Sequence, residues 1–272
     1  MSSGVVNGHV LVLANDLICR REATVAALWD QLKKYQVIHV RGTPTSGKST
    51  LARLLKDYVE RISPNTEVYA FSCQQPEVLK RGGINGSLYY QLLNFHTNRL
   101  INADDWLNMG NMLLIIDEAQ ASYQYGNLWT QYIKSVSSDG DCGRRVILFS
   151  SYGSPAEIPL NQNLVGSPPM QLSANQRVSI RPLTDNNQQV SLYFTRPEFD
   201  NVVARVCKHS GQNVQPFDPS AELLDYIWEF SNGHPAGTRV VLDALINSEV
   251  SIYSFYNHLY FSFTNLILRI SK

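Results

Sequence analysis

The sequence lacks several features that mark particular classes of protein. It has no excess of charge of either sign, because 23 Lys and Arg residues balance 23 Asp and Glu residues. The chain as a whole therefore gives no indication of nucleic-acid binding. Its four cysteines lie far apart and include no Cys-x-x-Cys pair, which fits neither a zinc site nor a disulfide framework. This usage is typical of reduced thiols, so we expect an intracellular protein of the cytoplasm or nucleus.

Long apolar runs, internal repeats and low-complexity segments are also missing. The N-terminal stretch has no basic region ahead of its short apolar run, which argues against a secretory signal. Residues 250–268 carry no formal charge, but seven of them are Ser, Asn, Thr or His. That polarity is poor for a membrane span of roughly 20 apolar residues. We therefore expect no membrane contact and interpret this region as a packed or truncated aromatic tail.

Short apolar runs alternate with helical patterns up to residue 185. Apolar runs of buried-strand length occupy 37–40, 66–73, 112–117, 145–151 and 178–183. Apolar residues at helical spacing occupy 22–35, 48–62, 86–100 and 125–136. Because the strands are apolar almost throughout and helices separate them, they predict a parallel sheet covered on both faces.

After residue 185 the strand patterns fade, and residues 196–210 and 220–233 predict helices. We therefore expect an α/β fold with three layers, α/β/α, followed by a small helical subdomain. The expected parts are an N-terminal extension (1–21), a core (22–185), a lid-like helical subdomain (186–247) and the aromatic tail (248–272).

One motif lies where the first predicted strand meets its helix. Residues 42–49, "GTPTSGKS", fit Gly-x-x-x-x-Gly-Lys-[Ser/Thr], the phosphate loop of P-loop NTPases, in the strand–helix context that this motif needs. Backbone N–H groups at the helix N-terminus would surround a phosphate, Lys48 would reach its oxygens, and Ser49 would hold Mg²⁺. The alternative is an ordinary strand–turn–helix corner. The residues predicted to bind nucleotide here are Gly42, Thr45, Ser46, Gly47, Lys48, Ser49 and Thr50.

A pair of carboxylates follows the apolar run 112–117. Asp117 is the last residue of that predicted strand, at the edge where open α/β sheets bind ligands. It would bind Mg²⁺ directly or through water. Glu118 comes next and is a candidate general base that orients an attacking water. The alternative is an Asp-Glu pair that caps the following helix.

Two further candidates are a serine pair and an arginine. Ser150 and Ser151 end the run 145–151, where either hydroxyl could sense the γ-phosphate or simply end the strand; we favour Ser150. Arg177 precedes the last predicted strand and is a candidate arginine finger. A surface salt bridge is the alternative for Arg177. His39 and His96 are interpreted as structural, His39 because it lies inside the first strand.

The expected helical subdomain carries three more candidates. Gly233, His234 and Pro235 form a sharp turn between helices, and the backbone of Gly233 and Pro235 is a candidate adenine contact. The alternative is a helix C-cap followed by proline. Arg239 begins the next helix and is a candidate phosphate contact, with a surface salt bridge as the alternative.

With these motifs the chain resembles the ATPases of the AAA+ and STAND division, which have an extra strand between the phosphate-loop strand and the Walker B strand. The resemblance implies a sheet order of 5-1-4-3-2, ATP and Mg²⁺ as cofactors, and Asp117 and Glu118 as metal ligand and catalytic base. The Gly233–Pro235 turn looks like the Gly-x-Pro element of STAND ATPases.

A narrower resemblance covers about residues 22–245. The strings "VIHVRGTPTSGKSTLARLL", "LLIIDEAQ", "ILFSSYGSP" and "FSNGHPAGTR" look like the NTPase domains of fungal Crinkler-type (retrotransposon hot spot-like) proteins. Members of that family often carry a further C-terminal region. This sequence departs from that pattern in stopping at Lys272 after the aromatic tail, so the resemblance carries no expectation of a nuclease module or a winged-helix lid.

These observations lead to two hypotheses for function. The first is Mg²⁺-dependent ATP hydrolysis coupled to a conformational change, and the second is an ATP-gated signalling or effector switch with little turnover. Both use the same site, and both accommodate a protein partner or self-association. The Asn-Lys-x-Asp string expected of a GTPase is absent, as is a helicase's later Arg-rich motif.

Overall fold

The computed structural model describes residues 17–73, 89–123, 125–138, 140, 143–151, 168–178, 180–181, 190–210 and 218–247. The chain forms two compact units, Arg20–Phe194 and a second unit made of Met1–Cys19 and Thr195–Lys272. The units divide between Phe194 and Thr195, and Val190 and Leu192 belong to the apolar core of the first unit. The expected start of a helical subdomain at residue 186 stays a prediction. The tail 248–272 and residues 1–16 of the expected extension lie outside the described residues.

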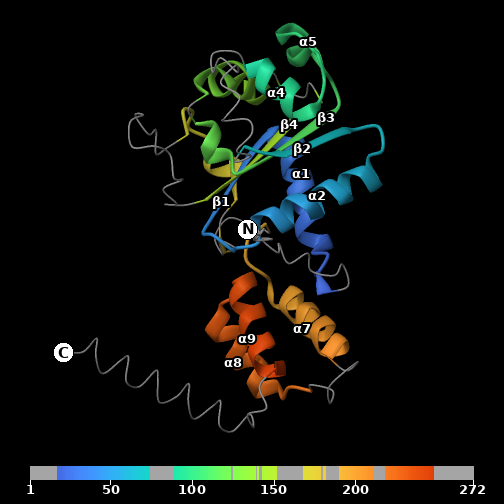
Figure 1. Ribbon diagram of the computed structural model, residues 1–272, viewed down its shortest axis with the longest axis vertical. Coiled ribbons are helices and arrows are strands. Elements are labelled where there is room, and N and C mark those ends of the chain that lie inside the picture. Colours follow the sequence, from blue (N-terminus) through green and yellow to red (C-terminus); the bar gives the residue numbers. More distant parts are fainter. Residues whose placement is uncertain are drawn as a thin grey trace, which may run out of the picture. The chain divides into compact units, whose positions relative to one another are not determined.

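A five-stranded parallel sheet forms the centre of the first unit (Figure 1). Its strands lie in the order β2-β3-β4-β1-β5, and every neighbouring pair is parallel. This confirms the predicted fold and the order 5-1-4-3-2. The strands are β1 (Val37–Gly42), β2 (Glu67–Ser72), β3 (Met112–Asp117), β4 (Arg144–Ser151) and β5 (Arg177–Val178).

Helices cover both faces of this sheet. Helices α1 (Glu22–Tyr35) and α2 (Lys48–Ile62) have the predicted bounds and pack on one face. The other face is covered by α4, α5, the π-helix η3 and α6. Their bounds are Tyr89–Thr97 for α4, Ala103–Asn108 for α5, Leu128–Ile133 for η3 and Lys134–Ser138 for α6. The helices predicted at 86–100 and 125–136 are thus shorter or partly of another type, and α5 was not predicted.

Side chains of the central strands alternate between the two faces, as the pleat of a strand requires. In β3, Leu113 and Ile115 pack towards α1 and α2, whereas Leu114 and Ile116 pack towards the opposite helices. In β4 the same alternation separates Ile147 and Phe149 from Val146 and Leu148. This alternation decides which face each polar residue at the strand ends occupies.

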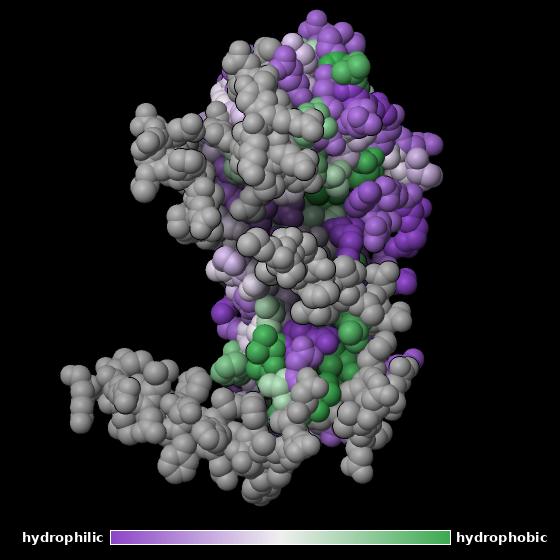
Figure 2. All heavy atoms as spheres, in the orientation of Figure 1, coloured by the Kyte–Doolittle hydropathy of each residue, from purple (hydrophilic) through white to green (hydrophobic). Residues whose placement is uncertain are grey.

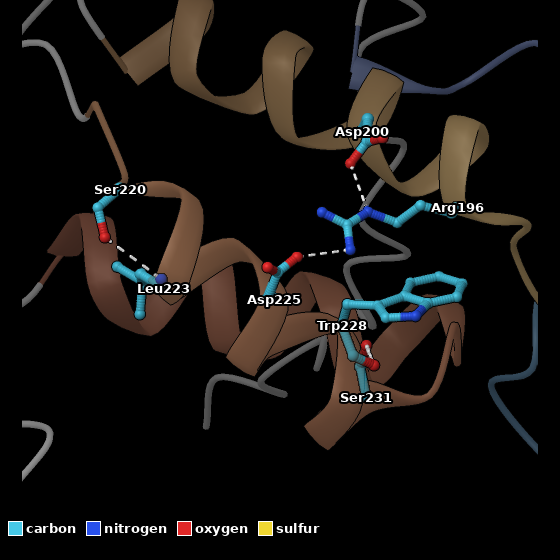
Figure 3. A network of polar contacts seen from close by, with 7 residues as sticks. All are labelled: Arg196, Asp200, Ser220, Leu223, Asp225, Trp228 and Ser231. Atoms are coloured by element: carbon cyan, nitrogen blue, oxygen red, sulfur yellow. Dashed lines mark hydrogen bonds and ion pairs between the residues drawn. The ribbon is translucent and has the colours of Figure 1, made fainter.

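The second unit contains α7 (Arg196–Ser210), α8 (Ala221–Ser231) and α9 (Pro235–Asn247). Figure 3 shows Arg196 between Asp200 and Asp225, bonded at 3.0 and 2.7 Å, with Trp228 beside it. These contacts join α7 to α8. The structure therefore confirms the helices predicted at 196–210 and 220–233.

The visible surfaces of the two units differ in polarity. Figure 2 shows apolar side chains gathered over the helices of the second unit, while hydrophilic side chains predominate over the described part of the first. In the second unit Val240 and Phe230 are 66% and 46% exposed. No helix among the described residues is both long enough and apolar enough to span a bilayer.

Candidate functional site

The loop between β1 and α2 is folded tightly over the first turn of that helix. Thr45 and Gly47 have positive φ angles of 62° and 89°, a left-handed conformation that glycine adopts at little cost. The Ser46 hydroxyl donates to the Thr43 carbonyl at 2.6 Å. The Leu51 N–H donates to the Gly47 carbonyl at 2.9 Å, so helical bonding begins at the end of the motif. The loop therefore turns tightly into the N-terminus of α2, the end of a helix that favours anions.

Gly42 begins this loop and has no room for a side chain. A Cβ atom there would lie 2.3 Å from Leu192 Cδ2 and 2.7 Å from Ser46 Oγ. Leu192 comes from the segment that leads out of the core towards the second unit. Any larger residue at the first glycine of the motif would therefore force the side chains of Leu192 and Ser46 to shift.

Lys48 belongs to the phosphate-loop motif and interacts electrostatically with the acidic pair. Its side chain is buried, and its Nζ donates to the carbonyls of Gly42 at 3.3 Å and Thr43 at 2.8 Å. Burial lowers the pKa of Lys48, while the negative charges of Glu118 and Asp117 act in the opposite direction. The ammonium group therefore lies close enough to both carboxylates to interact with them electrostatically.

The two carboxylates stand at the end of β3. The alternation of β3 turns Asp117 towards α2, and its Oδ1 accepts the Glu118 N–H at 2.9 Å. Glu118 has a φ angle of 49°, and its carboxylate accepts a hydrogen bond from Gln120 Nε2. The Glu118 side chain makes no capping bond to the following 3-10 turn, η2 (Ala119–Ser122), so the capping alternative does not describe it.

Ser49 and Asp117 are the residues suited to Mg²⁺. Both offer oxygen atoms, the ligand type that Mg²⁺ prefers, and Ser49 is exposed on the first turn of α2. Within the described ranges, no group of three or more His, Cys, Asp or Glu side chains could hold a metal by itself. This donor set fits an ion held partly by nucleotide phosphates, as is usual for Mg²⁺.

Ser150 lies on the other face of the sheet. Its buried hydroxyl is 2.9 Å from His39 Nε2 and accepts the Tyr123 hydroxyl at 3.2 Å. Burial, followed by the positive charges of Arg41 and Arg177, lowers the pKa of His39 to about 3. A neutral His39 can accept the Ser150 proton at Nε2, which would leave that hydroxyl no proton to donate to a phosphate.

Ser151, by the same alternation, lies on the α2 face with Asp117. It pairs with Gly42 across the β1–β4 ladder. Ser151 thus lies on the face of the phosphate loop and Ser150, the serine we favoured from the sequence, on the opposite face; the sensor role stays a prediction. His39 fits its structural interpretation, since its ring bonds Ser150 and contacts the edge of Trp129.

Arg177 is not brought to the phosphate loop within its own chain. It pairs with His39 in the β1–β5 ladder, three residues before Gly42. That separation is about 10 Å along the strand. Its Nε donates to the Leu172 carbonyl at 2.9 Å. A role as an arginine finger stays a prediction, and this position would suit action on a neighbouring molecule.

The candidates of the second unit lie at the start of α9. Gly233 has a φ angle of 73° in the turn after α8, and Pro235 is the first residue of α9, where its fixed φ is favourable. The C-cap alternative accounts for this local geometry. Arg239 Nε donates to Asp243 at 2.8 Å, an ion pair between successive turns. Contacts of these residues with a nucleotide stay predictions.

Arg21 is a residue that the sequence analysis missed. It is buried, and its Nη atoms donate to the carbonyls of Leu192, Ser191 and Tyr193 at 2.9, 3.0 and 3.1 Å. It therefore holds the segment whose leucine packs against Gly42. The available signal was the arginine pair at 20–21, directly before the first predicted helix.

Comparisons with known proteins give weak likenesses only. No protein-family model matches the chain, and no curated protein matches it. Domain III of the replication initiation protein DnaA from Thermotoga maritima is 14% identical with a TM-score of 0.44, over 89% of this chain and 90% of that chain. The Walker-type ATPase paby2304 of Pyrococcus abyssi is 15% identical with a TM-score of 0.47, over 85% and 68%. AMPPCP-bound DnaA from Aquifex aeolicus is 14% identical with a TM-score of 0.41, over 84% and 61%.

Proposed function

We propose that this protein binds and hydrolyses ATP with Mg²⁺ and couples this cycle to a conformational change. The observation that carries the proposal is that the phosphate loop and the acidic pair follow the carboxyl ends of two parallel strands of one sheet, β1 and β3. Lys48 is close enough to Asp117 and Glu118 for their charges to affect its pKa. A bare glycine-rich corner would not need this arrangement.

In the proposed reaction the loop binds the phosphates. Backbone N–H groups of residues 45–50 bind the β-phosphate, and Lys48 turns from the carbonyls of Gly42 and Thr43 to the β- and γ-oxygens. Ser49 and Asp117 would hold Mg²⁺, which would neutralise charge on the phosphates. Lys48 thus exchanges two carbonyl acceptors for charged oxygens, and hydrogen bonds to charged oxygens are stronger.

Glu118 is the proposed base. Its carboxylate orients a water and takes its proton, the water oxygen bonds to the γ-phosphorus, and the bond from that phosphorus to the β–γ bridging oxygen breaks. The products are ADP and inorganic phosphate. The Ser151 hydroxyl, on the same face, donates to the γ-phosphate.

The family assignment is part of this proposal. The strand order and the acidic pair support a place in the AAA+ and STAND division, and the four motif strings quoted above support the Crinkler-type NTPases within it. Gly233, Pro235 and Arg239 are proposed to contact the nucleotide from the second unit. A protein partner or a second copy of the chain would then respond to the bound state.

The test is phosphate release from ATP and Mg²⁺ by the purified chain, beside a titration with fluorescent ATP and competition by GTP. We expect turnover that is lost in Glu118→Gln while ATP binding is kept. Turnover at the wild-type rate in that variant would remove Glu118 from the mechanism. Tight binding without turnover in the wild-type chain would contradict hydrolysis and support a nucleotide-gated switch, and absence of binding would contradict both.

A further inference from the structure

One side chain connects the proposed base to the end of a neighbouring strand. Gln120 Nε2 donates to Glu118 Oε2, and Gln120 Oε1 accepts the Ser151 N–H at 3.1 Å. The Gln120 amide thus uses both of its polar atoms: its oxygen bonds the backbone of Ser151 in β4, and its nitrogen bonds the Glu118 carboxylate. Ser151 in turn pairs with Gly42, where the phosphate loop begins.

The backbone that carries Gln120 is itself held in place. Gln120 lies in the turn η2, whose first residue, Ala119, is fully buried. The Ser122 hydroxyl donates to the Ala119 carbonyl at 2.6 Å and accepts the Trp129 ring N–H at 3.0 Å. The turn is therefore anchored to the π-helix η3, which holds the backbone of Gln120 in place.

Among the described residues, Gln120 is the side chain that donates a hydrogen bond to the Glu118 carboxylate. Glu118 follows the last residue of β3, and its backbone is in the left-handed region. A carboxylate on a three-bond side chain samples many rotamers unless hydrogen bonds restrict them. A displacement of about 1 Å at a reacting group can lower a rate on the order of 100-fold.

We propose that Gln120 is a positioning residue for the hydrolysis described above: its amide orients the Glu118 carboxylate and ties it to the end of β4. This inference rests on the proposed function. Gln120 contacts no reacting atom in this role, so its loss lowers the rate of the chemical step and leaves ATP binding unchanged.

Two variants of Gln120 distinguish the hydrogen bond to Glu118 from the hydrogen bond to Ser151. Gln120→Leu removes both hydrogen bonds. Gln120→Glu keeps an oxygen that can accept the Ser151 N–H but replaces the donor to Glu118 with a second carboxylate. Gln131→Leu is a matched control, because Gln131 is an exposed glutamine of η3. Each variant is made in the full chain and also in a Glu118→Gln background.

The measurements are steady-state turnover, ATP affinity by fluorescent titration and thermal unfolding. We expect both Gln120 variants to lower kcat roughly 10-fold, with ATP Kd and the unfolding midpoint unchanged and the control at the wild-type rate. In the Glu118→Gln background, Gln120→Leu should lower the residual rate no further, because the carboxylate that it orients is gone.

Two results would overturn the role of Gln120 while the proposed function stands. One is an active wild-type chain whose kcat is unchanged or increased by both Gln120 variants. The other is a loss of equal size in the Glu118→Gln background, which would mark a structural role. A wild-type chain that binds ATP without turnover would instead refute hydrolysis itself, and the positioning role with it.

Discussion

The two faces of the sheet carry polar groups for different purposes. On the face of α2, Asp117, Lys48 and the phosphate loop meet at the carboxyl edge of the strands. On the opposite face, the buried side chains of His39 and Ser150 bond to each other, and the Tyr123 hydroxyl donates to Ser150. The polar groups of the first face are those that we propose to bind a ligand, whereas those of the second satisfy one another.

Neighbouring residues of β4 illustrate the difference. Ser150 and Ser151 are the same residue type in one strand, but alternation places them on opposite faces. We therefore expect substitutions on the α2 face to change binding and turnover, and substitutions on the other face to change stability.

The largest effect on the α2 face is expected from Lys48→Ala. The variant loses a charged hydrogen-bond donor to the phosphates, so ATP should bind roughly 100-fold more weakly. Fluorescent ATP titration measures this change. Lys56→Ala is the control, since Lys56 is an exposed lysine of the same helix paired with Glu60. Equal affinities for wild type and Lys48→Ala would contradict a phosphate role for this lysine.

Glu118→Gln should separate binding from chemistry. The amide cannot take a proton from water, and we expect kcat to fall on the order of 100-fold with ATP affinity retained. Phosphate release and nucleotide titration on the same preparation measure the two quantities. A parallel loss of both would show that Glu118 acts in binding rather than as a base.

On the opposite face, His39 should make stability depend on pH. Its pKa in the folded chain is about 3 and its ordinary value is 6.5, so the unfolded chain binds the extra proton between these values. The contribution of His39 to the free energy of unfolding is therefore fully present above about pH 6.5. It falls on acidification towards pH 3, by up to about 1.4 kcal/mol per pH unit.

Chemical unfolding at several pH values, with His39→Gln beside the wild type, measures this contribution. The wild-type free energy of unfolding should fall more steeply with acid than that of the variant. His96, whose pKa burial lowers to about 4, contributes to both chains and cancels in the comparison. Parallel curves would show that His39 does not titrate differently in the fold.

Ser150 and Ser151 allow the two faces of the sheet to be compared within one strand, β4. Ser150→Ala should lower the free energy of unfolding by about 1 kcal/mol, because Tyr123 and His39 lose a buried partner, and should leave kcat unchanged. Ser151→Ala should lower kcat by roughly 5-fold with stability unchanged, from the loss of one hydrogen bond to phosphate. The reverse result would restore Ser150 as the sensor.

The smallest effect is expected in the second unit. Arg239→Ala should weaken ATP binding by a few-fold without changing the unfolding of the core, if this arginine leaves Asp243 for a phosphate. Arg205→Ala is the control, because Arg205 lies in another helix of the same unit, where it bonds Asn201. Identical affinity and turnover for Arg239→Ala and wild type would identify Arg239 as a surface ion pair only.

Much of the fold could be predicted from the sequence because its signals are local. The helices 22–35, 48–62 and 196–210 have the predicted bounds, since apolar spacing and their flanking residues mark them within a few turns. Helix α5 was not predicted, since it is short and its buried side chain is Trp106 alone. The helix predicted at 125–136 forms in part as the π-helix η3, a helix type that apolar spacing does not specify.

The sequence by itself determined the phosphate loop and the acidic pair, because each lies within a few residues at a strand end. Only the tertiary structure decided that the charges of both carboxylates act on Lys48, that Gln120 joins Glu118 to β4, and that Arg21 holds the segment 191–193. It also placed Ser150 and Ser151 on opposite faces of the sheet. The physical reason is that a side chain's role depends on the face it occupies and on the partners already bonded to it, and these come from distant parts of the chain.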